Sequence, residues 1–170
     1  MMKYKLSIIY MALIVAVNVG FVATPMVALP GGALWPPMSL VVGFVFVARD
    51  FAQREAGHRV LLFMLMGAVL SYLMASPLVA AASAAAFLVG EGVDWAVYTV
   101  TKRPFSERIL YSSLLGAPLD SVVFLAAIGH LSATGAVAMT LSKFFGAVAV
   151  WWIMRRREAV KTLADYPLPR

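Results

Sequence analysis

Six apolar stretches, each long or nearly long enough to cross a lipid bilayer, run through this chain of 170 residues. A helix needs about 20 consecutive apolar residues to span the hydrocarbon core, and 62% of the residues are hydrophobic while 13% are charged. This composition is too apolar for a soluble protein of the same length. The sequence therefore predicts an all-α integral membrane protein with six transmembrane helices.

The predicted spans are separated by turns and by charged or glycine-rich loops. Trp35, a residue typical of a membrane interface, precedes Pro36 and Pro37, which suit a first helical turn. The first apolar run is longer than that of a signal peptide, so we expect a retained span. The spans cover residues 6–27, 36–48, 60–75, 78–101, 109–128 and 135–154, within a transmembrane domain of residues 1–158 that a cytoplasmic tail, 159–170, follows.

The lysines and arginines between the spans fall on one side of the predicted bundle. They lie at the N-terminus, in the loops after the second and fourth spans and at the C-terminus, whereas the opposite loops, near Gly31, Ser76 and Ser132, carry no charge. Because cytoplasmic loops are enriched in Lys and Arg, we expect both termini to be cytoplasmic in a bacterial-type inner membrane. Topology thus explains the net charge of +6, and no nucleic-acid partner is expected.

Four ionisable residues, Glu91, Asp94, Asp120 and Lys143, lie inside the apolar spans. A charge in hydrocarbon is costly, so such residues usually face inward and are partnered. From the helical rise, Glu91, Asp120 and Lys143 each lie roughly 16–18 Å from the nearest loop charge, near the middle of a core about 30 Å thick. Asp94 is about one turn closer to the cytoplasm. The spacing predicts a polar site at mid-membrane.

The fourth span presents two acids and two aromatic residues on one helix face. Glu91, Asp94, Trp95 and Tyr98 are spaced i, i+3, i+4 and i+7. One lysine cannot neutralise three acids, so at least one carboxylate needs another donor or stays protonated. A flat ligand with N–H donors would satisfy it. The alternative is that the charges only pair helices and that the aromatic residues only pack.

Other polar residues are weaker candidates for the same site. Asn18, in the first span, either bonds across helices or touches the ligand. Ser113 lies near Asp120 along its helix, and the alternative for such a serine is a bond to a carbonyl of its own helix. Asp50 belongs to a charged segment, residues 49–55, that we expect to be a solvated cytoplasmic face, with a gate role for Asp50 as the alternative.

Motifs for other chemistries are missing from the sequence. It has no phosphate-binding loop of the Walker type, no cysteine and no set of residues that predicts a metal site. His58 and His130 are expected near opposite membrane faces, which excludes a plausible Ser-His-Asp triad. We therefore expect no enzyme, no catalytic residue and no cofactor, and any active transport would use a gradient, a partner or downstream trapping.

The order of these motifs resembles that of the queuosine precursor transporters, also called the vitamin uptake transporter (VUT) family. The resemblance covers residues 5–155. It is carried in the first half by Leu29-Pro30-Gly31-Gly32-Ala33 with Trp35-Pro36, and by Asp50 followed by Gly57. In the second half, the family's pattern of an amide residue, Asp and an aromatic is matched by Glu91, Asp94 and Tyr98. Its pattern of Arg, Ser, Asp and an aromatic in the fifth span is matched by Arg108, Ser112, Ser113, Asp120 and Phe124.

The resemblance implies six helices in a fold similar to the substrate-binding components of energy-coupling-factor transporters. It implies uptake of a 7-deazaguanine, such as 7-cyano-7-deazaguanine or 7-aminomethyl-7-deazaguanine, for tRNA modification. Glu91, Asp94 and Asp120 would be the principal ligand groups, with Lys143 binding a ring acceptor or holding a carboxylate ionised. Asp50 and Arg108 would lie at the cytoplasmic face as gating residues.

Two departures from the family pattern bear on the ligand. Glu91 stands where a glutamine-like residue is expected, and Arg54 stands where the family often has an acid. Three alternatives remain open beside the transporter: a substrate-binding subunit that needs a separate ATPase, a membrane-embedded enzyme, and a structural membrane protein. The lipid bilayer and a planar base are the expected partners, and the oligomeric state, including a homo-oligomer, stays open.

Overall fold

The described residues of a computed structural model, 4–74, 76–100 and 105–164, form six α-helices, a short 3₁₀ helix and one hairpin. The helices are α1 (Lys5–Ala23), α2 (Ser39–Ala56), α3 (Val60–Met74), α4 (Pro77–Val100), α5 (Phe105–Ala127) and α6 (Ala133–Ala164), with η1 (Gly57–Arg59) and strands β1 (Val27–Ala28) and β2 (Leu34–Trp35). The side chains at positions 91, 94, 95, 98, 99, 105, 108 and 158–164 lie outside the described part of the structure.

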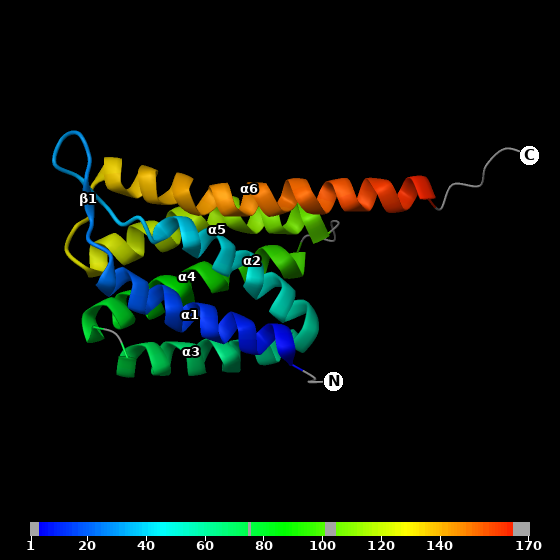
Figure 1. The fold of residues 1–170 in the computed structure, drawn as a ribbon, viewed down its shortest axis with the longest axis horizontal. Coiled ribbons are helices and arrows are strands. Elements are labelled where there is room, and N and C mark those ends of the chain that lie inside the picture. The colour runs from blue at the N-terminus through cyan, green and yellow to red at the C-terminus, as the bar shows by residue number, and fades with distance from the viewer. Residues whose placement is uncertain (1–3, 75, 101–104, 165–170) are drawn as a thin grey trace, which may run out of the picture.

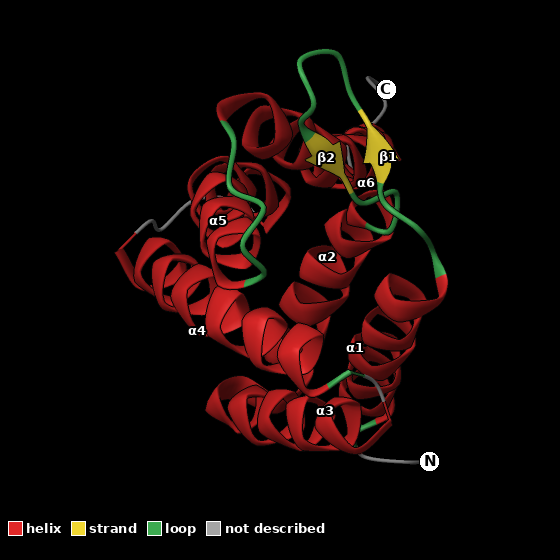
Figure 2. Ribbon diagram, turned by 90° about the vertical axis from the view of Figure 1, so that its left-hand side faces the viewer, coloured by secondary structure: helices red, strands yellow, loops and turns green. Residues whose placement is uncertain are grey.

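The helices form a bundle in two groups that α2 joins (Figures 1 and 2). On one side, α1 packs against both α2 and α3, and on the other, α5 packs between α4 and α6. The long contact of α2 with α6 connects the two groups, and a smaller contact of α3 with α4 closes the bundle. Four helices, α2, α4, α5 and α6, therefore surround the region where the predicted buried charges lie.

The apolar helices confirm the coarse prediction of a helical protein suited to a membrane. Four apolar helical stretches are long enough to cross one: Lys5–Ala23, Ser39–Met74, Ile109–Ala127 and Ala133–Arg157. The second of these contains α2, η1 and α3 together. The third of the six predicted spans is α3, whose 15 residues give about 22 Å of helix, less than the hydrocarbon thickness. In α4 the uninterrupted run of described residues, Pro77–Gly90, is apolar but shorter than a span. Six separate spans therefore stay a prediction.

The charged segment after the second predicted span is helical and only partly solvated: Arg54 is exposed as expected, whereas Arg49 is buried, and so is Asp50, which is the alternative left open for it. Helix α2 begins at Ser39 and continues to Ala56, well beyond position 48. Arg49 and Asp50 are 1% and 4% exposed, and the Arg49 Nη1 atom lies 2.7 Å from the Asp50 Oδ1 atom. Their charges compensate each other inside the bundle, which is how buried ions are tolerated.

The chain after the sixth predicted span is also helical. Helix α6 runs to Ala164, so it extends through the first half of the predicted tail, residues 159–170. Figure 1 shows this part of α6 leaving the bundle.

The loop rich in proline and glycine folds as a two-stranded antiparallel hairpin, which the sequence did not predict. Val27 pairs with Trp35, and Ala28 pairs with Leu34. The turn contains Gly31 and Gly32, whose φ angles of +84° and +77° disfavour residues with a Cβ atom. The hairpin lies beside the start of α6, at the end of the bundle opposite the chain termini (Figure 1).

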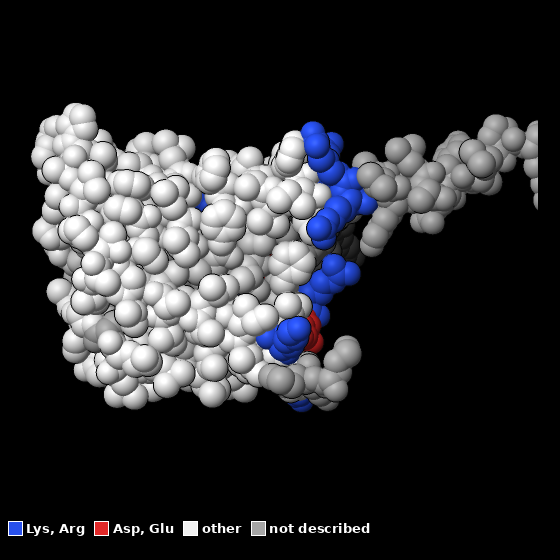
Figure 3. All heavy atoms as spheres, in the orientation of Figure 1, with Lys and Arg blue, Asp and Glu red and all other residues white. Residues whose placement is uncertain are grey.

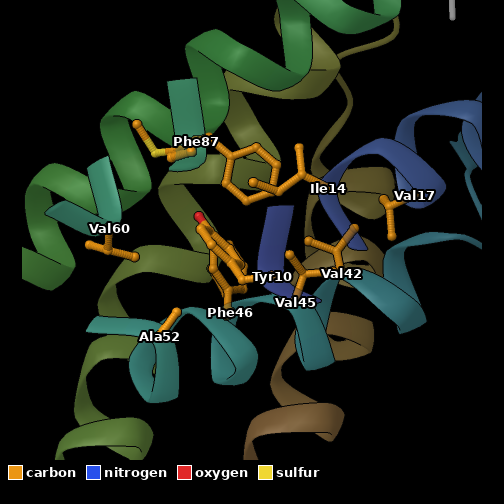
Figure 4. Packing of buried hydrophobic residues seen from close by; sticks show 11 residues of the cluster. Tyr10, Ile14, Val17, Val42, Val45, Phe46, Ala52, Val60 and Phe87 are labelled. Carbon is orange, nitrogen blue, oxygen red and sulfur yellow. The ribbon is translucent and has the colours of Figure 1, made fainter. Parts of the chain in front are cut away.

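The largest hydrophobic cluster joins residues of α1, α2, α3, α4 and α5. Figure 4 shows Tyr10 and Ile14 of α1 packed beside Phe46 of α2 and Phe87 of α4. The Phe46 and Phe87 rings meet edge to face with centroids 6.0 Å apart. Outside this cluster many apolar side chains are exposed, including Leu62 and Leu73 of α3, as expected of helices that face lipid.

Two glycines allow the backbones of α2 and α6 to touch. A Cβ atom on Gly43 would overlap the carbonyl oxygen of Lys143, and one on Gly146 would lie 2.7 Å from the Gly43 carbonyl carbon. Small residues at helix crossings permit this close approach in membrane proteins. The crossing fixes the height at which Lys143 faces the other helices.

We expect Gly43→Ala to destabilise the bundle, because the added methyl group meets backbone that cannot rotate away. Overpacking of this kind costs about 1–3 kcal/mol, which thermal unfolding of the purified protein would show as a lower Tm. Gly92→Ala is the matched control, since a Cβ atom there meets nothing within 4 Å and alanine favours a helix. An equal effect of the two substitutions would contradict a tight crossing at Gly43.

Candidate functional site

Asp120 of α5 and Lys143 of α6 form an ion pair in the interior of the bundle. The Lys143 ammonium donates a hydrogen bond to the Asp120 Oδ2 atom, and the two residues are 1% and 3% exposed. The residue count had placed both at one depth and facing inward, and the contact confirms this. Lone charges are costly to bury, whereas a paired and bonded couple is tolerated.

Helices α2 and α4 also reach this pair, so four helices meet at one point. A Cβ atom on Gly90 of α4 would lie 3.5 Å from the Asp120 Cβ atom and 3.7 Å from the Phe46 ring of α2. The Lys143 backbone rests on Gly43, one turn before Phe46. Gly43, Phe46, Gly90, Asp120 and Lys143 are called the central site from here on.

The four side chains predicted to form the acid-rich face of α4 lie outside the described part of the structure. The side chains of Glu91, Asp94, Trp95 and Tyr98 lie outside the described residues, as does that of Arg108. The neighbouring Gly90 is described, and its contact with Asp120 brings this part of α4 to the central site. The part that these side chains take in a site therefore stays a prediction.

The serines near the central site mostly bond within their own helices. Ser112 donates to the Ile109 carbonyl oxygen at 3.3 Å, and Ser121 donates to that of Ala117 at 2.7 Å. This is the alternative that the sequence left open for such serines. Ser113 is buried as well, so it lies in the interior of the bundle.

Ser142, the residue before Lys143, connects α6 to the hairpin. Its hydroxyl accepts a hydrogen bond from the Trp35 indole nitrogen at 2.9 Å and donates to the Ala138 carbonyl oxygen at 2.7 Å. Trp35 was expected as an interfacial residue, and this bond gives it a second role, because it holds β2 against α6.

Asn18 is buried in the interior of the bundle. Its amide nitrogen donates to the Ile14 carbonyl oxygen at 2.9 Å, and its Oδ1 atom has no hydrogen-bond partner among the described residues. It lines a cavity of about 60 Å³ with Met64, Ser83 and Phe87. Phe21, one turn after Asn18 on α1, packs on Phe124 of α5, one turn after Asp120, with ring centroids 4.8 Å apart.

The size of the Asn18 cavity limits what it can hold. A volume of about 60 Å³ compares with roughly 30 Å³ for a water molecule and roughly 300–1,000 Å³ for small-molecule pockets. It has room for water and is smaller than a typical small-molecule pocket. One wall of the cavity is Phe87, whose ring meets that of Phe46 of the central site edge to face.

Arg49 and Asp50 form a second buried charged pair, which the sequence interpretation missed as a pair. It lies in α2 beyond Gly43, roughly 9 Å farther along the helix by its rise, toward the end where the chain termini lie. Val47 beside it packs on Ile109 of α5 and Ala147 of α6. One signal in the sequence favours a helix that continues through Arg49 and Asp50: no glycine or proline lies between Gly43 and Gly57.

Exposed charges gather at one end of the bundle (Figure 3), the end where α1 begins and α6 leaves it. Glu55 at the end of α2 caps α1 there, accepting hydrogen bonds from the Leu6 and Ser7 backbone nitrogens at 3.2 and 3.0 Å. The exposed basic residues of the described chain are Lys5, Arg54, Arg59, Arg155, Arg156 and Arg157. This agrees with the one-sided distribution seen in the sequence, while the assignment of that side to the cytoplasm stays a prediction.

Comparisons of the chain with models of protein families, with curated proteins and with solved structures find no match. The resemblance to the queuosine precursor transporters consequently rests on the sequence motifs alone.

We expect Asp120→Asn to destabilise the fold strongly, because it leaves the Lys143 ammonium buried without a counter-charge. Removing one partner of a buried pair typically costs about 3–5 kcal/mol, whereas replacing both by apolar residues is often neutral. The double substitution Asp120→Leu with Lys143→Met should therefore recover much of the loss. Thermal or denaturant unfolding of the single and double variants measures both effects, and additive losses would show that the two charges do not interact.

Proposed function

We propose that the chain is a membrane transporter that imports a queuosine precursor, a 7-deazaguanine such as 7-cyano-7-deazaguanine or 7-aminomethyl-7-deazaguanine, for tRNA modification. The observation that carries the proposal is the buried Asp120–Lys143 pair at the meeting point of four helices. Intramembrane charges of this kind typically mark a substrate or ion pathway. The sequence motifs, which resemble those of the queuosine precursor transporters, select the substrate.

The chemistry of the ligand fits an acid-rich interior. A deazaguanine presents its N1–H and exocyclic amino group along one edge, and a carboxylate accepts two such donors side by side. Glu91 and Asp94 are the proposed acceptors, with Asp120 held ionised by Lys143. An aminomethyl substituent would add a positive charge and favour a second carboxylate. Lys143 is the donor available to an acceptor atom of the ring.

Aromatic side chains would bind the faces of the planar ring. Trp95 and Tyr98 are the candidates from the sequence, and Phe46 is added here because its ring lies beside Gly90 and hence close to Asp120. Stacking on an aromatic ring is worth about 0.5–1.5 kcal/mol beyond the area that it buries. Phe87, in edge contact with Phe46, supports that ring from behind.

The proposal places the central site within a six-helix domain of a bacterial-type inner membrane. Release toward the cytoplasm would pass the buried Arg49–Asp50 pair, which lies between Gly43 and the charged end of α2. We therefore propose Asp50, together with Arg49, as a cytoplasmic gate, and Arg108 as a further residue of that face. A fold similar to the substrate-binding components of energy-coupling-factor transporters belongs to the same proposal.

Calorimetric titration of the purified protein tests ligand binding. We expect both 7-deazaguanines to bind and adenine, which lacks the N1–H donor, to bind far more weakly. Glu91→Gln and Asp120→Asn should each weaken binding at least tenfold, or about 1.4 kcal/mol, in samples shown to be folded. The absence of binding by any deazaguanine would contradict the proposed substrate, and unchanged binding by both variants would show that the site lies elsewhere.

Uptake by proteoliposomes that contain this chain alone separates a transporter from a binding subunit. We expect labelled deazaguanine to accumulate inside the vesicles. An uncoupler should reduce this accumulation, and unlabelled guanine-like bases should compete with it. Binding without uptake would instead support a substrate-binding subunit that needs a separate ATPase.

A further inference from the structure

Two tryptophan–arginine pairs lie on α6 where it leaves the bundle. The Arg156 guanidinium carbon lies 3.6 Å from the centroid of the Trp152 ring, and that of Arg155 lies 5.3 Å from the centroid of Trp151. In both pairs the arginine follows the tryptophan by four residues, so the two side chains share a helix face. Attraction between a cation and an aromatic face holds each guanidinium over its ring.

The position of these pairs along α6 matches the boundary of a bilayer. The tryptophans follow Lys143 by eight and nine residues, or roughly 12–14 Å, and the arginines by 12 and 13 residues, or roughly 18–20 Å. With Lys143 at mid-membrane, the hydrocarbon boundary lies about 15 Å from it. The indole rings would then lie just inside this boundary and the guanidinium groups just outside it, at the level of lipid phosphates.

Both arginines of the pairs are accessible, and one of the two indole rings is well exposed. Arg155 and Arg156 are exposed, and the Trp152 side chain is half exposed. Lys5, Arg54 and Arg59 are exposed at the same end, which Figure 3 shows as a basic rim. Because a guanidinium stacked on a ring still presents its planar edge of N–H donors, it can bind two oxygens of one phosphate.

We propose that the Trp152–Arg156 and Trp151–Arg155 pairs form a binding site for the phosphate headgroup of an anionic phospholipid. The lipid would belong to the leaflet at the charged end of the bundle. A free phosphate ion would use only the arginines, whereas a phospholipid also places its glycerol and acyl chains against the indole rings. The inference is independent of the proposed transport function, since it needs only that α6 crosses the bilayer.

Native mass spectrometry of the detergent-purified protein can count the lipids that it retains from an equimolar mixture of phosphatidylglycerol and phosphatidylcholine. We expect phosphatidylglycerol to be retained severalfold more than phosphatidylcholine. Arg156→Gln should lower this ratio at least twofold. Trp152→Leu should also lower it, although it removes no charge.

Arg157→Gln is the matched control. It removes the same charge one residue away, and the structure describes no aromatic ring against Arg157 in the part of the chain that it covers. We expect it to lower the ratio less than Arg156→Gln does. Circular dichroism establishes that each variant is folded, and Arg156→Lys, which keeps the charge and removes the planar edge, replaces Arg156→Gln if that variant fails to fold.

Three results would overturn the proposal. A wild-type protein without preference for phosphatidylglycerol would show that no anionic-lipid site exists. Equal losses for Arg156→Gln and Arg157→Gln, with no effect of Trp152→Leu, would show general attraction of charges instead of a built site. Loss of the lipid preference on adding inorganic phosphate at constant ionic strength would assign the arginines to a free anion.

Discussion

The buried pair of Asp120 and Lys143 is the interaction around which the bundle is organised. Neither charge can remain in the interior alone, so α5 and α6 must keep the register that joins them. The Lys143 backbone also lies against Gly43, which ties the position of the ammonium group to the crossing of α2 and α6. Gly90 brings α4 to the same point. Packing and electrostatics thus reinforce each other at the central site.

Residue counting predicted the common depth of Asp120 and Lys143, without choosing between Asp120 and Glu91 as the partner of Lys143, because the rise of a helix is nearly constant and the charges that bound the spans are visible in the sequence. The same reasoning failed at Arg49 and Asp50, where burial depends on α5 and α6 covering the end of α2. A sequence read one helix at a time cannot show that cover. The neighbours of Asn18, which come from α3 and α4, likewise follow from which helices pack around α1, and periodicity does not determine that.

The charged groups of the described chain form a series along the bundle. The central site lies in the interior, the Arg49–Asp50 pair lies between it and one end, and the exposed arginines with their tryptophans surround that end. The described charges therefore extend from the interior toward one end of the bundle, and the hairpin lies at the opposite end. Such an asymmetric interior suits a protein that receives a polar ligand from one side and releases it on the other.

The account depends on the central charges serving a ligand as well as the fold. The most direct measurement is binding of 7-aminomethyl-7-deazaguanine to the double variant Asp120→Leu with Lys143→Met, compared with the unmodified chain by calorimetry. The account predicts a variant that unfolds at nearly the same temperature and has lost binding. A stable variant that binds the ligand as tightly as the unmodified chain would contradict it and leave the pair a device of packing alone.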